Sequence, residues 1–336
     1  RAFGMDKTGP GPRNYSLKWV WAGDRRRALY AGANAGAPHR LNDVWEYDLA
    51  GNTWILLWQP DPDLHHADKT STGAVFELRD GVPMSRRGAP FDPVHTWWAL
   101  AWDEEHHELV WDIGHFNKVR WPYPGYEKPK SQYLWSYSPQ ARRWRPLLAA
   151  NPLRQTNADM LEYIPALGGL VHYGNSWGLR GMHALDRSLE PPVWRDLRPN
   201  RGADFQGPGF PQPEAIGCWL APPGVWLVQS GHATHRYDPQ ANAWSRVLDG
   251  GNDDTPLGRD NRAAMACVPG VGKAYIVDAD PADPAGKRGR LWSFDPAAAR
   301  WTRLTPNGPP PDWGMLYFDA SRQILVVQGR GPRPWV

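Results

Sequence analysis

The sequence predicts an all-β fold in which six units of four short strands stack in a closed ring, and three observations support this prediction. An aromatic residue followed seven residues later by a Trp, with a polar turn between them, recurs along the chain. Two apolar runs of strand length precede these copies. The 336 residues include 34 Gly, 35 Pro and 21 Trp, and the Trp outnumber the 12 Tyr and the 8 Phe. This composition indicates many turns and an aromatic core.

The recurring motif is clearest in four segments, which are residues 44–54, 134–144, 234–244 and 291–301. A fifth, looser copy runs from Met182 through Leu185 to Trp194 and has two extra residues in its turn. The closing Trp residues stand at positions 54, 144, 194, 244 and 301, at intervals of 90, 50, 50 and 57 residues. The first interval is long enough to indicate an insertion.

Six pairs of apolar runs supply the first two strands of each unit. The pairs are 17–21 with 28–32, 97–102 with 109–114, 160–164 with 169–174, 216–220 with 225–231, 263–268 with 274–278, and 315–318 with 324–329. These runs are rich in Val, Trp, Tyr and Leu and are bounded by Gly, Pro and Asp, which is typical of short strands. A sustained 3.6-residue period is missing, so very low helix content is expected. The sequence therefore predicts a six-bladed β-propeller with four-stranded blades.

The last unit reaches the end of the chain after its second strand. Residues 1–3 and the Pro/Gly stretch after them resemble the segment that follows each closing Trp. We expect the N-terminal strand to close the last blade from outside while Trp335 and Val336 begin its third strand, which removes open sheet edges. Residues 1–336 then form a single domain. The expected blades are 14–58, 95–149, 157–199, 214–249, 261–306, and 311–336 plus 1–5.

At these motifs the sequence resembles the Kelch family of β-propellers, and the resemblance covers essentially the whole chain. The family pattern has a strand ending in Gly-Gly, a loop, an aromatic–Asp turn and a Trp about seven residues beyond the aromatic. One glycine of the doublet remains in five of six copies here, namely Gly32, Gly114, Gly174, Gly231 and Gly329. The resemblance implies that first strands line a central channel, with strand-one entrances and strand-two exits on one face. Some Kelch-like enzymes resemble galactose oxidase, whose copper and Cys-linked Tyr have no obvious place here.

Charge and composition exclude several classes of protein. The 38 Lys and Arg against 35 Asp and Glu give a net charge of +3, too small to suggest a partner in nucleic acid or a membrane surface. The longest uncharged stretch, residues 215–231, is interrupted by Pro222 and Pro223, so no membrane span is predicted. Cys218 and Cys267 are either two small core residues or one bridge between adjacent blades. Because the chain begins with Arg1, we expect a removed leader or a piece of a longer protein.

Polar residues are expected to gather at the channel mouth. The strand-one entrances carry Asn14, His95, Asn157, Glu214, Asn261 and Pro311, with Tyr15, Thr96, Arg262 and Asp312 one step further on. The strand-two exits carry Asn34, His115, Asn175, His232, Asp280 and Arg330, and His172 and Asp112 precede two of them. Two long connections, residues 59–94 and 117–131, are expected to rise over this mouth.

Three interpretations of this polar ring remain open. The residues satisfy backbone groups and waters in a wet channel, they recognise a ligand or a protein surface, or they bind a metal. In the third case a divalent ion is held by His95, His115, His172 and His232, with Glu214 or Asp112 as a carboxylate partner. Phosphate-binding loops and dinucleotide fingerprints are absent from the sequence, which disfavours nucleotide chemistry.

Two functions follow from these interpretations. The first is a binding or assembly module for a protein partner or larger assembly, in which the long loops supply the contacts. Its ligand-binding candidates are Arg120, Trp121, Tyr123, Tyr126, Asn175, Arg262 and Arg330. The alternative is a secreted or periplasmic metal-dependent enzyme, a lyase or oxidoreductase acting on a saccharide or small polar substrate. There the histidines hold the ion, Tyr15 or Glu214 is the acid or base, and Arg262 or Arg330 binds a substrate carboxylate.

Overall fold

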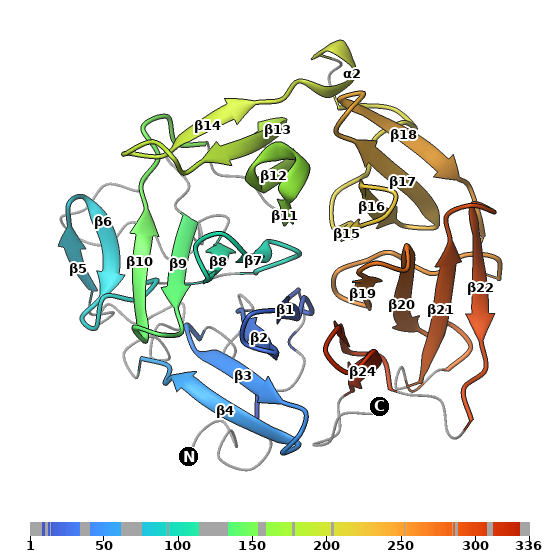
Figure 1. The fold of residues 1–336 in the computed structure, drawn as a ribbon, viewed down its shortest axis with the longest axis horizontal. Coiled ribbons are helices and arrows are strands. Elements are labelled where there is room, and N and C mark those ends of the chain that lie inside the picture. The colour runs from blue at the N-terminus through green and yellow to red at the C-terminus, as the bar shows by residue number, and fades with distance from the viewer. Residues whose placement is uncertain are drawn as a thin grey trace.

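Short antiparallel strands make up most of the structure, a computed structural model in which small sheets surround a common axis (Figure 1). The described residues are 9–10, 13, 15–33, 41–61, 76–91, 93, 95–113, 134–153, 159–176, 179–202, 205–251, 253–283, 285, 288–307 and 312–329. Within them, five sheets have four strands each and two sheets have two. The helical elements of this part are the 3-10 turn η2 (Pro165–Leu167) and the short α2 (Pro199–Gly202).

Each four-stranded sheet takes its strands from one stretch of sequence, and we call these sheets blades 1 to 5. Blade 1 contains β1 (Val20–Ala22), β2 (Arg27–Ala31), β3 (Val44–Asp48) and β4 (Thr53–Trp58). Blade 2 contains β7 (Leu100–Asp103), β8 (Glu108–Asp112), β9 (Leu134–Ser138) and β10 (Arg143–Leu147). Blade 3 contains β11 (Met160–Ile164), β12 (Gly169–Ser176), β13 (Leu179–Asp186) and β14 (Val193–Asp196). Blade 4 contains β15 (Ile216–Leu220), β16 (Val225–Ser230), β17 (Ala233–Asp238) and β18 (Ala243–Leu248). Blade 5 contains β19 (Ala263–Val268), β20 (Lys273–Ala279), β21 (Gly289–Asp295) and β22 (Arg300–Leu304).

A two-stranded sheet, β23 (Met315–Asp319) with β24 (Ile324–Gln328), fills the space between blade 5 and blade 1 (Figure 1). The first strands are neighbours in chain order around the axis, and β23 packs against both β19 and β1. A bridge from Lys18 to Leu316 joins the two ends of this circle. The inner strands therefore form a closed ring of six units.

The predicted all-β propeller with four-stranded blades is confirmed, but five such blades are present where the repeat count predicted six. The sixth unit has two strands, β23 and β24, in the described part of the protein. Residues 1–5, Trp335 and Val336, which were predicted to complete it, lie outside the described residues. The part of the chain that is described contains no helix long and apolar enough to cross a membrane.

The seven-residue spacing of the motif corresponds to a cross-strand pair at the outer hairpin of a blade. Tyr47 lies opposite Trp54, and the same register pairs Tyr137 with Trp144, Tyr237 with Trp244 and Phe294 with Trp301. The ring centroids of these pairs are 5.0, 5.1, 5.4 and 5.0 Å apart. Directly opposed aromatic side chains stabilise an antiparallel pair, so each motif fixes its own hairpin.

A disulfide links two neighbouring blades near the axis. Cys218 in β15 and Cys267 in β19 are bonded, with Cα atoms 5.7 Å apart. The sequence left open whether these residues pair, since the bridge needs two adjacent first strands in matching register. The bond fixes blade 4 against blade 5 at the wall of the ring.

The insertion, residues 59–94, was predicted to rise over the channel mouth. Its described part lies at the outer edge of the ring instead (Figure 1). It contributes the hairpin β5 (Phe76–Arg79) with β6 (Val82–Ser85), which lies at the outer edge of the ring beside β10 (Figure 1). The Arg87 guanidinium stacks 4.1 Å from the Trp58 ring and makes a 2.9 Å ion pair with Asp61. These contacts hold the segment after the hairpin on the outer strand of blade 1 and away from the axis.

Candidate functional site

We call the side where first strands begin and second strands end the mouth face, and the side where the first strand turns into the second the turn face. On the mouth face, Tyr15 packs against His95 with ring centroids 4.4 Å apart, and His95 lies 5.1 Å from the Trp97 ring. Tyr15 and Trp97 have φ values of 57° and 49°, which L-residues rarely adopt. The Trp97 N–H donates a 2.6 Å hydrogen bond to the Tyr15 carbonyl, which holds both strained residues in place.

The predicted acid–base residues Tyr15 and Glu214 both interact electrostatically with Arg259 on this face. The Arg259 guanidinium makes a 2.7 Å ion pair with Glu214, and its pKa is raised by that contact and, more weakly, by Tyr15. Beside them Asp260 is fully buried, and neither of its carboxylate oxygens has a hydrogen-bond partner. Burial first, and then the charge of Glu214, raise the pKa of Asp260 well above its usual range, against the opposing effect of Arg259. A proton is therefore held at Asp260 where an ordinary Asp would be ionised.

We expect Asp260→Asn to stabilise the protein at pH 7, because Asn does not have to take up the proton that the buried carboxyl group binds on folding. Above about pH 4, the folded state keeps a proton on Asp260 that the unfolded state releases, so stability falls as pH rises toward the raised pKa. Asn removes this loss. Urea unfolding across a pH series measures it, with the exposed Asp253→Asn as control. A variant less stable than the wild type at pH 7 would contradict this account.

The described histidines of the predicted metal site have separate surroundings. His95 packs on Tyr15, and the His232 Nδ1 lies 3.3 Å from the Thr255 carbonyl. His172 is fully buried between blades 2 and 3. His115 lies outside the described residues. Among the residues that the structure describes, His95, His172 and His232 do not come together in one cluster that could hold a metal ion.

Of the remaining predicted ligand-binding residues, the structure describes only Arg262 and the backbone of Asn175. Arg262 is exposed, and its backbone N–H donates a hydrogen bond to the Arg259 carbonyl. Asn175 lies in β12 opposite Arg180, where its backbone alone is described. Outside the described residues lie Arg120, Trp121, Tyr123, Tyr126 and Arg330.

A buried group of three titratable residues lies between blades 2 and 3. It consists of Asp112 at the end of β8, Asp159 just before β11 and His172 in β12, which are 1%, 1% and 0% exposed. The His172 Nε2 is 3.5 Å from Asp112 Oδ2 and 3.5 Å from Asp159 Oδ2. Burial acts to lower the pKa of His172, but the carboxylates of Asp159 and Asp112 outweigh it and raise this pKa. These are the residues of the described chain that could hold a metal ion.

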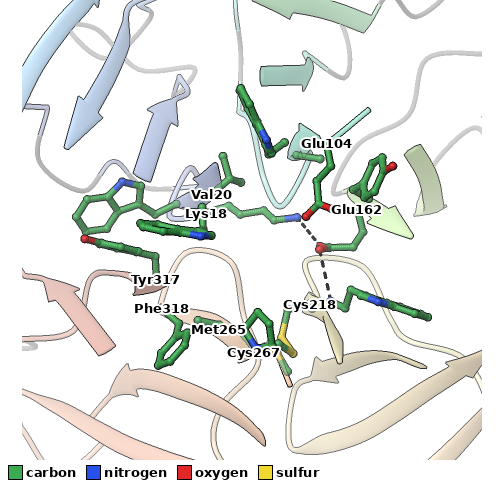
Figure 2. Close-up of a pocket in the computed structure, with 18 of the residues that line it drawn as sticks. Lys18, Val20, Glu104, Glu162, Cys218, Met265, Cys267, Tyr317 and Phe318 are labelled. Atoms are coloured by element: carbon green, nitrogen blue, oxygen red, sulfur yellow. Dashed lines mark hydrogen bonds and ion pairs between the residues drawn. A yellow bond between two sulfur atoms is a disulfide. The ribbon is translucent and has the colours of Figure 1, made fainter. Parts of the chain in front are cut away.

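A cavity of about 180 Å³ lies on the axis toward the turn face, and the first strands of all six units line it (Figure 2). Its walls include the Trp21, Trp102 and Trp219 side chains and the Cys218–Cys267 disulfide. Figure 2 shows Lys18, Glu104 and Glu162 pointing into the same space from three different units. The cavity thus combines aromatic walls with three charged groups, of which two are acidic.

A buried ion pair spans this cavity. The Lys18 Nζ donates hydrogen bonds to Glu162 Oε2 at 2.7 Å and to the Leu161 carbonyl at 2.6 Å, which joins blade 1 to blade 3. The Trp219 N–H of blade 4 lies 3.4 Å from Glu162 Oε1. Burial lowers the pKa of Lys18 and raises that of Glu162, and each shift is opposed by attraction between the two groups. The pKa of Glu104 is raised by burial and then by the charge of Glu162.

Trp98 lies next to Lys18, inside the ring. Its indole is fully buried and lies 5.7 Å from the Lys18 Nζ. The indole N–H donates a 2.6 Å hydrogen bond to the Gly217 carbonyl of blade 4, although Trp98 itself directly precedes the first strand of blade 2. The Trp98 side chain therefore links blade 2 to blade 4 inside the ring.

Sequence reasoning missed Lys18, Glu104, Glu162 and Asp159. A detectable signal existed for two of them, since Lys18 and Glu162 are single charges inside apolar first strands. A charge is rarely buried without a partner, so each of these strands implied an opposite charge nearby.

Comparisons with known proteins assign the chain to no family. No protein-family model matches the chain, and no curated protein matches it. Among solved structures, it is similar to TolB from Acinetobacter baumannii, with 10% identity and a TM-score of 0.44, over 89% of this chain and 56% of that one. It is also similar to a GH74 enzyme of Niastella koreensis, with 13% identity and a TM-score of 0.48, over 97% of this chain and 42% of that one. The chain thus spans about half the length of the solved structures it matches.

Proposed function

We propose that this protein is a ligand-binding propeller whose axial cavity receives a small polar molecule at the turn face. The observation that carries the proposal is the Lys18–Glu162 pair, a desolvated ion pair that borders open space inside a ring of aromatic side chains. Removing two charges from water is costly, and an apolar pair of similar volume would often stabilise a core as well or better. Such a pair is better suited to recognition than to stability alone.

The lining favours a ligand with hydrogen-bond donors on one side and an apolar face on the other. With both carboxyl groups ionised, Glu104 and Glu162 against Lys18 leave one negative charge, which suits hydroxyl or ammonium donors. The Trp21, Trp102 and Trp219 side chains offer ring surface for C–H groups or for a cation. Small saccharides and organic ammonium compounds share this chemistry.

Binding is expected to quench Trp fluorescence, and calorimetry with maltose, glucosamine and choline as probes measures it. Glu104→Gln should weaken the affinity for the probe that binds about tenfold or more, because a charged hydrogen-bond acceptor is lost. The matched control is Glu105→Gln. This next residue is exposed like Glu104 but does not line the cavity. Equal affinity of both variants, or no binding of any probe at millimolar concentration, would count against the site.

Binding or assembly through the long loops remains a separate proposal for this protein. Its anchors, Trp121, Tyr123, Tyr126 and Arg120, belong to the 117–131 connection, so deletion of that connection is the test. Loss of partner capture with unchanged thermal stability is the result expected. We also infer that the repeat is a divergent Kelch repeat, supported by the recurring aromatic–Trp pairs of blades 1, 2, 4 and 5.

The mouth face supports acid–base chemistry on a small polar substrate as a second candidate function. The specific observation is the buried Asp260 beside the Glu214–Arg259 pair, since carboxyl groups with raised pKa values are suited to act as general acids. Turnover of saccharides that is lost in Glu214→Gln but kept in Glu104→Gln would support this function. Turnover unaffected by Glu214→Gln would remove it.

A further inference from the structure

We propose that Asp112, Asp159 and His172 form a binding site for one divalent metal ion, Zn²⁺ or Mn²⁺, which fastens blade 2 to blade 3. The site is distinct from the axial cavity and from the mouth face, and it uses only one histidine of the predicted metal set. Asp159 was not among the sequence-based candidates.

The distances fit metal ligands better than direct hydrogen bonds. The His172 Nε2 lies 3.5 Å from one oxygen of each aspartate, and the ligand atoms of all three residues are within 4.8 Å of one another. A charged N–H···O hydrogen bond is shorter, at about 2.7–2.9 Å. Two ligands of a tetrahedral ion with bonds of about 2.0–2.2 Å lie roughly 3.4 Å apart. The separations therefore leave room for an ion between the three groups.

The imidazole of His172 is the second, independent indication. The residue is 0% exposed, and neither ring nitrogen makes a hydrogen bond. A buried polar group without a hydrogen bond costs free energy, and few occur in folded proteins. Since the Nε2 faces both carboxylates, a metal ion there would satisfy it.

The types of donor atom also suit a divalent cation. Carboxylate oxygens and the nitrogen of a neutral imidazole are common ligands of such ions. Mixed carboxylate and imidazole donors suit Zn²⁺ and Mn²⁺.

The backbone around the site explains its role. Asp112 donates its N–H to the Ala99 carbonyl of blade 2, and Asp159 accepts a hydrogen bond from the Trp98 N–H through its carbonyl. These bonds place one aspartate on each side of the boundary between the two blades. An ion held by both would therefore link the blades and contribute its binding free energy to folding.

Elemental analysis of the purified full chain tests the proposal, after growth with Zn²⁺ or Mn²⁺ and dialysis to remove loosely bound metal. We expect about one equivalent of metal per chain, and loss of at least nine-tenths of it in both His172→Gln and Asp159→Asn. His232→Gln is the matched control and should retain the metal. Chelation should lower the Tm of the wild type and leave that of His172→Gln unchanged.

A spectroscopic measurement covers the case in which the variants do not fold. Titrating metal-free wild-type protein with Co²⁺ should produce the intense visible bands of a four-coordinate site, saturating at about one equivalent. Wild-type protein that takes up no metal and shows no such bands would overturn the proposal and identify the group as an ion triplet of His172 with two aspartates. Full metal content in folded His172→Gln would overturn it equally.

Discussion

Replacing Lys18 with Met is expected to destabilise the protein by about 3–5 kcal/mol, because it leaves the Glu162 carboxylate buried without its partner. The side chains of Lys18 and Glu162 are 7% and 15% exposed, so water compensates little for the lost contact. The stability lost in Lys18→Met should be smaller at acidic pH. The raised pKa of Glu162 lets the folded variant bind a proton that the unfolded chain releases, so stability falls as pH rises through that window.

A double-mutant cycle separates the ion pair from simple packing. Lys18→Met together with Glu162→Leu removes both charges, and the double variant should recover to within about 1 kcal/mol of the wild type or exceed it. Urea unfolding of the four proteins measures the coupling. Lys273→Met, at an exposed position of β20, is the control for loss of a positive charge. Additive effects of the two substitutions would show that the pair is not coupled.

Removal of the Cys218–Cys267 bond is expected to cost about 4 kcal/mol. The bond closes a loop with a sequence separation of 49, and the entropy lost by the unfolded chain grows with the logarithm of that separation. The Cys218→Ala/Cys267→Ala variant should unfold at lower urea concentration with a larger m-value, since its unfolded state is less compact.

Reduction of the wild type provides the control for this experiment. Reduced wild-type protein should match the double Ala variant, because both lack the same constraint. If reduction leaves the unfolding midpoint unchanged, the bond contributes nothing to stability. Because the disulfide also lines the axial cavity, weaker probe binding in the double variant would show that the bond shapes the ligand site as well.

The sequence predicted the blade architecture well because the information for it is local. Tyr47 and Trp54 are seven residues apart and meet across one tight hairpin, so their spacing alone reveals the pair. The sixth unit departs from the predicted four-stranded blade, because its described residues form only the two strands β23 and β24. The residues predicted to complete it lie outside the described part of the chain. The insertion was misplaced for a different reason. Its position depends on Arg87 meeting Trp58 and Asp61, which no repeat encodes.

The candidate sites depend on contacts between units, and these are hard to predict. Lys18 and Glu162 are 144 positions apart, and their pairing follows from the register of blade 1 against blade 3. Asp112 and His172 were identified as neighbours of strand exits, yet their approach to Asp159 requires the relative height of blades 2 and 3. The alternation of apolar and polar residues along a strand indicates which side chains face inward. It does not indicate how far one blade is shifted along the ring axis relative to the next.

The Trp98 indole has a consequence for traffic through the molecule. It is fully buried and hydrogen-bonded from blade 2 to a carbonyl group of blade 4. A molecule moving between these two blades would therefore have to displace this side chain and break its hydrogen bond.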